Sequence, residues 1–496
     1  MSTPKIAAQG YRFDFGPGLS RQGIVTRLAR NDDRQGGRRF GYLLDDRPLA
    51  SSLGRTVGAD PADFLDVFAM ARLADGLAPR VVPGDIRPPA ERWHRPMHLV
   101  VPLRRPDVWQ SPAVSAVLTE LLLHVSDDVW SFDFTRRIAQ SRPAESQVQL
   151  FPRIEGPPPL VLLNCGGLDS LLGLISASMG RKSESVLAVS VVTHQRRRTV
   201  IEEVLAALRK GLPPTGPLVE SAQLRLHGSS VGRPFSDRES TQRTRGPLFL
   251  ATGVVAAILA GTNDLRLTEN GVGAINLPCL PDQTGARATK ATHPRTLDLM
   301  ARLASLVFEQ PITITNTGLF LTKGELSRAL LDGRFVDAAR HTVSCERFPY
   351  TTARTACGRC PSCVMRRVSL QAANLSDLDA STREYDFDPL LPESEWVERD
   401  IAPLYAMREL VERLRAVLEG EDPRRTLMGR FPVLDDVILM APELGMTEAD
   451  LGMRLVRLFR AYVAEFDGYA GEIDRPGWRQ ATISTLQAPE VSAIAG

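Results

Sequence analysis

The sequence predicts an α/β protein built on a doubly wound parallel sheet and followed by a knot of four cysteines. Between residues 160 and 325, short apolar runs alternate with helical patterns, which is typical of a parallel sheet with helices on both faces. The predicted strands cover 160–165, 186–193, 220–227, 264–269 and 312–316. The four cysteines follow within one short segment, at Cys345, Cys357, Cys360 and Cys363.

Residues 1–155 are predicted to form a small α+β domain. It mixes strand-like runs with helical patterns, namely strands at 98–103 and 129–134 and helices at 61–76 and 112–125. Pro152 and the prolines of 157–159 can continue neither a helix nor a central strand, so they predict a boundary before residue 156.

The sheet and the cysteines together predict a second domain over 156–383. Residues 384–496 are predicted to form a C-terminal helical domain, with helices at 400–418 and 447–466 and a polar tail from about 480. No internal repeat is present in the sequence.

Composition excludes several classes of protein. With 496 residues, 43% hydrophobic and 24% charged, the chain has room for two or three globular domains. The apolar stretch at 254–260 is too short to span a bilayer, and no basic region followed by an apolar one opens the chain, so we expect a cytoplasmic protein. The net charge of +2 does not favour nucleic acid as a partner.

Basic residues are almost all arginine, and they cluster at several points. Each cluster is more typical of a solvated face than of a phosphate track; the clusters are Arg104-Arg105, Arg136-Arg137, Arg196-Arg197-Arg198 and Arg366-Arg367. Lysine occurs only at positions 5, 182, 210, 290 and 323. Lys323 is therefore notable, because the chain has a lysine there although most of its basic residues are arginine. The two side chains are not interchangeable.

A glycine pair follows the first predicted strand of the sheet, in the string Asn164-Cys165-Gly166-Gly167-Leu168-Asp169-Ser170. Strand, tight turn and helix start come together there, and amides at a helix start favour an anion such as phosphate. No lysine follows the glycines, so a Walker-type kinase or GTPase is not indicated. A bare turn before a helix would show the same string.

The cysteine spacing favours a closed, structural zinc site with four thiolate ligands, Cys345, Cys357, Cys360 and Cys363. A disulfide or a redox pair does not account for a third clustered cysteine. His341 is an alternative to Cys345 as the fourth ligand. Cys279, outside the cluster, is interpreted as a buried or loop thiol without a catalytic role.

The glycine loop resembles that of the PP-loop ATP pyrophosphatases, and the loop with its C-terminal four-cysteine knot resembles the QueC family of 7-cyano-7-deazaguanine synthases. The likeness covers about residues 156–375, and further strings support it: 243–249 (RTRGPLF), 269–271 (ENG), 292–294 (THP) and 322–325 (TKGE). These strings and the extra length are closer to the long QueC-like branch of bacterial anti-phage defence, which includes QatC and the relative found in CBASS operons.

The resemblance implies a HUP-type sheet that binds ATP, with Mg²⁺ and a structural zinc as further cofactors. The loop would hold the phosphates while the α phosphate is attacked, and Asp169 would orient Mg²⁺. The implied catalytic residues are Asp169, Ser170 and Lys323; the implied ATP-binding residues are Cys165, Gly166, Gly167, Leu168, Asp169, Ser170, His194 and Arg245; the implied substrate-binding residues are Arg243, Glu269 and Asn270.

Simpler roles remain open for several of these residues. Ser170 could be a helix cap, Arg243 and Arg245 could form surface ion pairs, and Asn270 could belong to a turn. Cys165, His194, His227 and Glu269 are expected at the carboxyl ends of strands, where such sheets bind ligands. The chain departs from the family at Cys165, where serine is usual, and in the eleven residues between Cys345 and Cys357, a longer spacing than usual.

The implied activity is adenylation of a 7-deazaguanine acid, such as 7-carboxy-7-deazaguanine, and its capture by an amine. The amine would be ammonia or would belong to a partner protein or nucleic acid that the added domains present. Two alternatives remain: a PP-loop enzyme that modifies tRNA, and a defence scaffold or sensor that binds a nucleotide without turnover.

Overall fold

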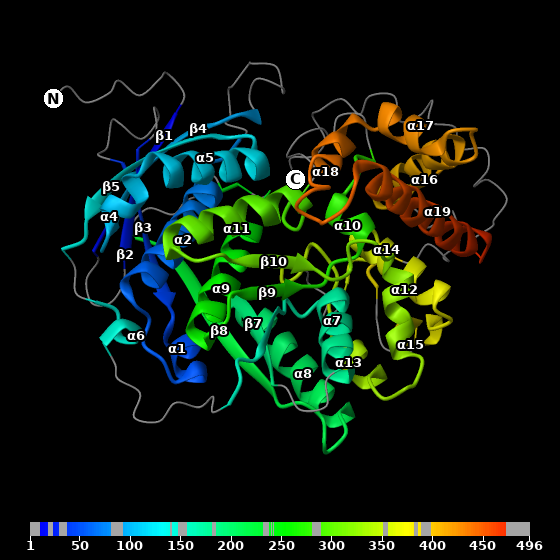
Figure 1. The fold of residues 1–496 in the computed structure, drawn as a ribbon, viewed down its shortest axis with the longest axis horizontal. Helices are drawn as coiled ribbons and strands as arrows, with labels where there is room; N and C mark the ends of the chain where they lie inside the picture. Colours follow the sequence, from blue (N-terminus) through cyan, green and yellow to red (C-terminus); the bar gives the residue numbers. More distant parts are fainter. Residues whose placement is uncertain are drawn as a thin grey trace.

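One sheet of ten strands, with helices on both faces, organises the chain (Figure 1). It is seen in a computed structural model, which describes residues 10–17, 23–28, 37–80, 93–138, 141–146, 156–180, 185–231, 238–239, 241, 243–279, 289–350, 356–380, 385–387 and 398–472. The strand order is β10-β9-β6-β7-β8-β3-β2-β1-β4-β5, and most neighbouring pairs are parallel.

The five strands predicted between residues 160 and 325 are all present and mutually parallel. They are β6 (Leu160–Leu163), β7 (Val186–Val192), β8 (Val219–Ser230), β9 (Asp264–Leu267) and β10 (Thr313–Asn316). The prediction of an α/β fold with a parallel sheet is confirmed at this level.

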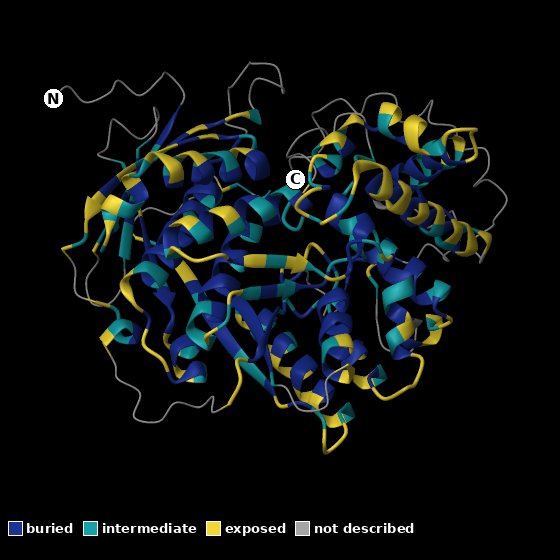
Figure 2. Cartoon of the chain, viewed as in Figure 1, coloured by how far each residue is buried: buried dark blue, intermediate teal, exposed yellow. Residues whose placement is uncertain are grey.

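Both faces of the sheet are buried at β7, as its near-continuous apolar run requires. Val186 and Ala188 pack on one face with helices α7 (Leu168–Met179), α8 (Gln195–Gly211) and α13 (Val336–His341). Leu187 and Val189 point to the other face, which is covered by α2 (Ala59–Leu77), α9 (Arg245–Ala260) and α11 (Pro294–Phe308). In Figure 2 the buried residues, in dark blue, lie on the central strands and on the helices packed against them.

The N-terminal strands extend the same sheet. They are β1 (Tyr11–Pro17), β2 (Gly23–Leu28), β3 (Arg38–Asp45), β4 (Pro96–Leu103) and β5 (Val129–Arg136), and β3 joins β8 in an antiparallel pair. Four helices accompany them: α1 (Arg47–Leu53), α4 (Pro106–Gln110), α5 (Pro112–Ser126) and α6 (Pro143–Ser146). One hydrophobic core therefore runs across the predicted boundary near residue 156.

The pairing of β3 with β8 corrects one expectation. His227 does not lie at the carboxyl end of its strand, because β8 continues to Ser230 and His227 is paired there with Leu43. The second half of β8 is extended because β3 supplies its hydrogen-bonding partner. The length of that strand was therefore decided by a segment almost 200 residues earlier, which a local pattern cannot reveal.

The remaining helices gather beyond the carboxyl end of the sheet and to one side of it (Figure 1). They are α10 (Gly271–Ile275), α12 (Lys323–Ser327), α14 (Pro361–Ala372), α15 (Ser376–Ala380), α16 (Glu398–Leu418), α17 (Pro423–Arg430), α18 (Asp435–Ile438) and α19 (Glu448–Glu472). Helices α16 to α19 share a core of their own that also includes residues of α10 and α14. The polar tail predicted from about 480 lies outside the described residues.

Among the helices that the structure describes, none has the length and apolarity needed to cross a membrane.

Candidate functional site

The order of the parallel strands reverses between β6 and β9. β7 and β8 lie to one side of β6, and β9 and β10 lie to the other. Open α/β sheets bind ligands in the crevice outside the carboxyl ends of the strands at such a switch point. The glycine loop after β6 and the segment Thr268–Asn270 after β9 meet there.

The glycine loop is shaped by Asn164, a residue that the sequence analysis did not single out. The side-chain oxygen of Asn164 accepts a hydrogen bond from the Gly166 N–H at 3.1 Å and another from the Ser170 hydroxyl at 3.3 Å. Gly166 has a φ of +78°, a value that L side chains rarely adopt. An asparagine directly after a strand and before two glycines is a turn signal that could have identified this role.

Helix α7 begins in this loop without a side-chain cap. Gly167 is the capping residue, and Ser170 is already in the first turn, where its hydroxyl donates to the Gly167 carbonyl at 3.0 Å. Ser170 is therefore not the N-cap that was considered as its simpler role. The first amides of an α-helix have no intrahelical acceptor, so this helix start can bind an anion.

Asp169 and Lys323 form a buried ion pair at the switch point. The Lys323 Nζ lies 2.6 Å from Asp169 Oδ2, and the two residues are only 6% and 7% exposed. The Asn270 side chain donates to Asp169 at 3.2 Å and to Glu269 at 3.0 Å, and its own oxygen accepts the Gly273 N–H at 2.9 Å. Three predicted site segments, far apart in the sequence, are thus brought together.

Glu269 shares the single ammonium group of Lys323 with Asp169. Burial and the negative charge of Asp169 raise the pKa of Glu269 to about 8, although Lys323 opposes the shift. Burial alone would lower the pKa of Lys323, but the carboxylates of Asp169 and Glu269 raise it above its usual value. The site therefore holds one cation near two acids, and the raised pKa favours the protonated form of Glu269 at neutral pH.

This arrangement predicts a pH-dependent stability that Glu269→Gln removes. The folded protein keeps a proton on Glu269 that the unfolded chain releases between pH 4.5 and about 8, so wild-type stability falls as the pH rises through that range. The melting temperature of Glu269→Gln, relative to wild type, should be higher at pH 8.5 than at pH 5.5. Two melting curves that stay parallel across this range would contradict the protonated state assigned to Glu269.

Side chains of α19 contact the turn that carries Lys323 and fix its position. The Thr322 hydroxyl donates to Glu465, and Arg457 forms an ion pair with Glu325 and also donates to the Phe320 carbonyl at 3.0 Å. Burial is the largest of the causes that raise the pKa of Glu465 to about 7. The C-terminal helices thus contribute to the position of Lys323, a role that no sequence motif indicated.

The other predicted phosphate and substrate residues are divided between two places. His194 caps α8 by accepting the Arg196 N–H at 3.1 Å, and Arg245 begins α9 at the same edge of the sheet. Arg243 instead donates to Thr289 at 2.7 Å, and its pKa is lowered by burial and by the charge of Arg80. No described contact joins Arg243 to the group around Glu269.

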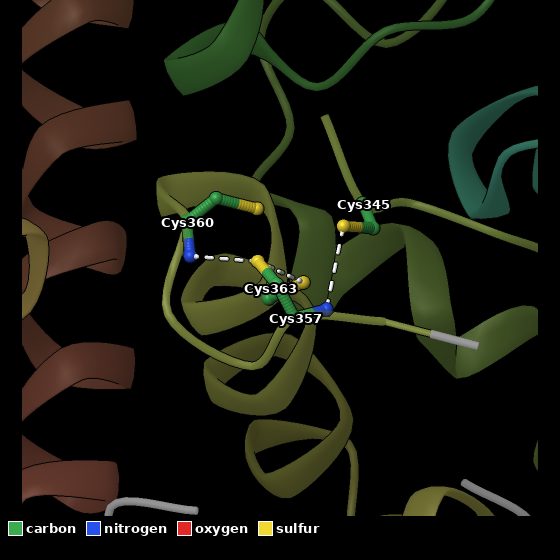
Figure 3. A group of neighbouring side chains, drawn as sticks. All are labelled: Cys345, Cys357, Cys360 and Cys363. Carbon is green, nitrogen blue, oxygen red and sulfur yellow. Dashed lines mark hydrogen bonds between the residues drawn. The ribbon is translucent and has the colours of Figure 1, made fainter. Parts of the chain in front are cut away.

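The four clustered cysteines meet in one buried site (Figure 3). Their sulfur atoms all lie within 4.8 Å of one another, and backbone N–H groups point at two of them, Cys357 to Cys345 and Cys360 to Cys357, each at 3.4 Å. Tetrahedral Zn–S bonds of about 2.3 Å would place the sulfurs about 3.8 Å apart. The donor set therefore fits a metal ion such as zinc.

The cysteine segment is linked to the glycine loop. The Val343 N–H donates to the Gly166 carbonyl at 3.0 Å. Arg197 bridges the two parts, because its guanidinium donates to the Cys165 carbonyl at 3.4 Å and to the Phe348 carbonyl at 2.9 Å. The geometry of the loop therefore depends on the fold of the cysteine segment.

Two of the arginines that were expected on solvated faces are buried. Arg366 is 1% exposed and pairs with Asp379 at 2.9 Å, and Arg197 is 8% exposed. The expectation was wrong for these two residues because other segments cover them: Arg197 donates to the carbonyls of Cys165 and Phe348, and Arg366 donates to Asp379 and Thr342. Exposure of an arginine cannot be judged from its neighbours in the sequence.

Fold and site together define an α/β protein with a helix start that lacks a side-chain cap at its switch point and a buried cluster of four cysteines that could hold a metal. Comparison of the sequence with protein-family models and with curated proteins yields no match. The chemistry of the site therefore has to follow from its own residues.

Proposed function

We propose that this protein is an ATP-dependent adenylating enzyme of the QueC-like kind, acting on the carboxylate of a 7-deazaguanine. The observation that carries the proposal is the meeting of Asp169, Lys323 and Glu269 at the switch point, beside the uncapped start of α7. A helix start supplies donors for phosphate, a carboxylate supplies a ligand for Mg²⁺, and a lysine supplies a mobile positive charge.

In the proposed complex, the amides of Leu168 to Ser170 at the start of α7 hold the terminal phosphates. Lys323 moves its ammonium from Asp169 to a phosphate oxygen, and this frees the Asp169 carboxylate for Mg²⁺. Bound Mg²⁺ would neutralise charge on the departing pyrophosphate. In this proposal the ion pair of Lys323 and Asp169 keeps each charge partnered until ATP binds.

Glu269 is proposed to bind the deazaguanine. A guanine-type edge presents two N–H donors side by side, and a carboxylate offers two matching acceptors. Glu269 would act as this double acceptor in its ionised form, after releasing its proton to solvent. Asn270 has its amide fully used by Asp169, Glu269 and Gly273, so we assign it a positioning role.

The reaction proceeds in two substitutions. A carboxylate oxygen of the acid attacks the α phosphorus and pyrophosphate leaves, which produces an acyl-adenylate. An amine then attacks the acyl carbon, AMP leaves with the bonding electrons, and the nitrogen loses a proton to give an amide. A second ATP-dependent activation of the amide oxygen would give the nitrile. The amine is ammonia or an amine on a partner macromolecule, as the resemblance to the defence branch suggests.

The four clustered cysteines have a structural role in the proposal. Zinc bound by Cys345, Cys357, Cys360 and Cys363 would hold the segment that supports the glycine loop. Reduced thiols at these positions suit the cytoplasm.

The proposal predicts that the protein forms AMP from Mg-ATP and 7-carboxy-7-deazaguanine. The measurement is mass spectrometry of the nucleotides and deazaguanine products, with and without ammonium. AMP with an amide or nitrile would support the enzyme, and AMP that requires a protein or RNA acceptor would identify the amine as macromolecular. If the protein binds ATP but forms no AMP with this acid and any acceptor, the result would contradict adenylation of this substrate and favour a nucleotide sensor.

A further inference from the structure

We propose that a second anion site, a pocket for a phosphate group, lies at the carboxyl ends of β4 and β5 in the N-terminal part of the sheet. Its donors belong to Arg104, Arg136, Arg137 and Ser141. The ligand is free inorganic phosphate or the phosphate group of a monoester. The pocket is separate from the switch point, so the inference goes beyond the proposed function and does not depend on it.

The sheet contains two groups of parallel strands that run in opposite directions. β6 to β10 form one group, and β1, β4 and β5 form the other. Three successive antiparallel pairs, β8 with β3, β3 with β2 and β2 with β1, reverse the direction between the groups. The carboxyl ends of β4 and β5 therefore lie at the edge of the sheet opposite to the glycine loop, and six strands separate β5 from β6.

Two arginine pairs that are distant in the sequence meet at this second edge. Arg104 and Arg105 directly follow β4, and Arg136 ends β5 just before Arg137. Leu103 lies opposite Arg136 in the parallel pair, and its carbonyl accepts the Arg137 N–H at 2.8 Å. The carboxyl ends of parallel strands are where α/β sheets bind their ligands. The fold thus brings both pairs to a position typical of a binding site.

A cavity of about 200 Å³ lies at this position. Its lining consists of Arg104, Arg136, Arg137, Ser141 and Glu145. The volume is below the range typical of pockets for drug-sized ligands, so the cavity suits a small group. Its donors come from three segments, namely the end of β4, the end of β5 and the turn before α6. Such convergence suits a phosphate group, which presents three strong acceptor oxygens, better than a carboxylate, which presents two.

The acids beside the cavity are held by arginines on its inner side. The Arg104 guanidinium pairs with Asp63 at 2.8 Å and with Asp66 at 2.6 Å. Arg142, at the turn before α6, also pairs with Asp66. The side chains of Asp63 and Asp66 are 0% and 2% exposed, so these carboxylates face the protein interior. The network fixes Arg104 at the wall of the cavity without turning these two acids toward it.

Glu145 is the acid in the lining of the cavity, and both of its oxygens accept hydrogen bonds. Oε2 accepts from the Arg104 side chain at 2.8 Å, and Oε1 accepts the Arg142 N–H at 3.0 Å. Arg136 and Ser141 form no ion pair or side-chain hydrogen bond within the described part of the chain. The cavity therefore presents unused donors and more positive than negative charge, and both favour an anion.

The test is calorimetric titration of the full-length protein with sodium phosphate and with phenyl phosphate, in a chloride buffer of constant ionic strength. Arg136→Gln should weaken binding by about 10-fold, the lower end of the range for losing a hydrogen bond to a charged group. This variant should fold, because Arg136 is exposed and supports no other described side chain. Arg105→Gln is the matched control, because Arg105 pairs with Asp60 at 2.8 Å and does not line the cavity. Its affinity should equal that of wild type.

Tighter Arg136-dependent binding of phenyl phosphate would support the proposal with a monoester as the ligand, and tighter binding of phosphate would support it with the free anion. No binding of either probe to wild type at millimolar concentration would overturn it. Equal affinities in wild type and Arg136→Gln would also overturn it, because phosphate held at the glycine loop would not depend on Arg136. Acetate that binds as tightly as phosphate, with the same dependence, would exclude phosphate as the specific ligand. None of these outcomes depends on AMP formation.

Discussion

Asp169→Asn is expected to reduce AMP formation by on the order of 10³-fold while leaving the protein folded. The amide cannot replace a carboxylate as a ligand for Mg²⁺ at the start of α7, so charge on the departing pyrophosphate loses its main compensation. Stability should change little, because Lys323 still faces the Glu269 carboxyl when Asp169 is neutral. The measurements are the initial rate of AMP release and the melting temperature.

The matched control for this substitution is Asp264→Asn. Asp264 begins β9 at the opposite edge of the sheet and pairs with Arg266 at 2.8 Å. Its AMP rate should equal that of wild type. Lys323→Met should behave differently from Asp169→Asn, because the buried Asp169 carboxylate would lose its cation at a cost of about 3–5 kcal/mol. An Asp169→Asn protein with more than a tenth of wild-type activity would remove Asp169 from the mechanism.

Cys360→Ser is expected to abolish metal binding at the cysteine cluster and to cost more than about 4 kcal/mol, beyond the usual range of a single substitution. The four thiols share one site, and for structural zinc the binding energy is folding energy. Loss of the cluster would also release the contact between Val343 and Gly166 that supports the glycine loop. The measurements are zinc content per chain and thermal unfolding.

Cys279→Ser is the control for the cysteine experiment. Cys279 lies outside the cluster, and burial raises the pKa of its thiol to about 11. This variant should keep one zinc ion per chain. A Cys360→Ser protein that is soluble, melts like wild type and retains full zinc would rule out the structural metal site.

Much of the parallel sheet could be predicted from local pattern. Strands such as β7 are buried on both faces, so their sequences are continuous apolar runs that end at polar turns. The four clustered cysteines could be assigned to one metal site because their close spacing in the sequence is typical of the ligands of a single metal ion. β1, β2 and β3 were not predicted, although β1 and β2 alternate between buried and partly buried residues, a period of two that indicates a strand, so this signal was present in the sequence and was missed.

The sequence predicted which residues belong to the site, but it did not predict how they are arranged in space. Glu269 and Lys323 were selected from their motifs, but the shared ammonium and the retained proton depend on two strand ends meeting beside the start of α7. Glu465 was missed because it acts on Thr322, which a distant part of the chain supplies, whereas Asn164 acts within its own loop and could have been identified from the turn signal. Arg366 was assigned to the surface because nothing in its neighbours indicates Asp379 as a partner.

The sequence by itself determined the α/β class, the five parallel strands, the glycine loop and the cysteine cluster. Each of these depends on residues within a few turns of one another, where periodicity and spacing carry the physical constraint. Only the tertiary structure decided that the N-terminal strands continue the sheet and that Lys323 pairs with Asp169 close to Glu269. Burial and charge compensation are set by segments that are distant in the chain, and these are the quantities that determine what the site can bind.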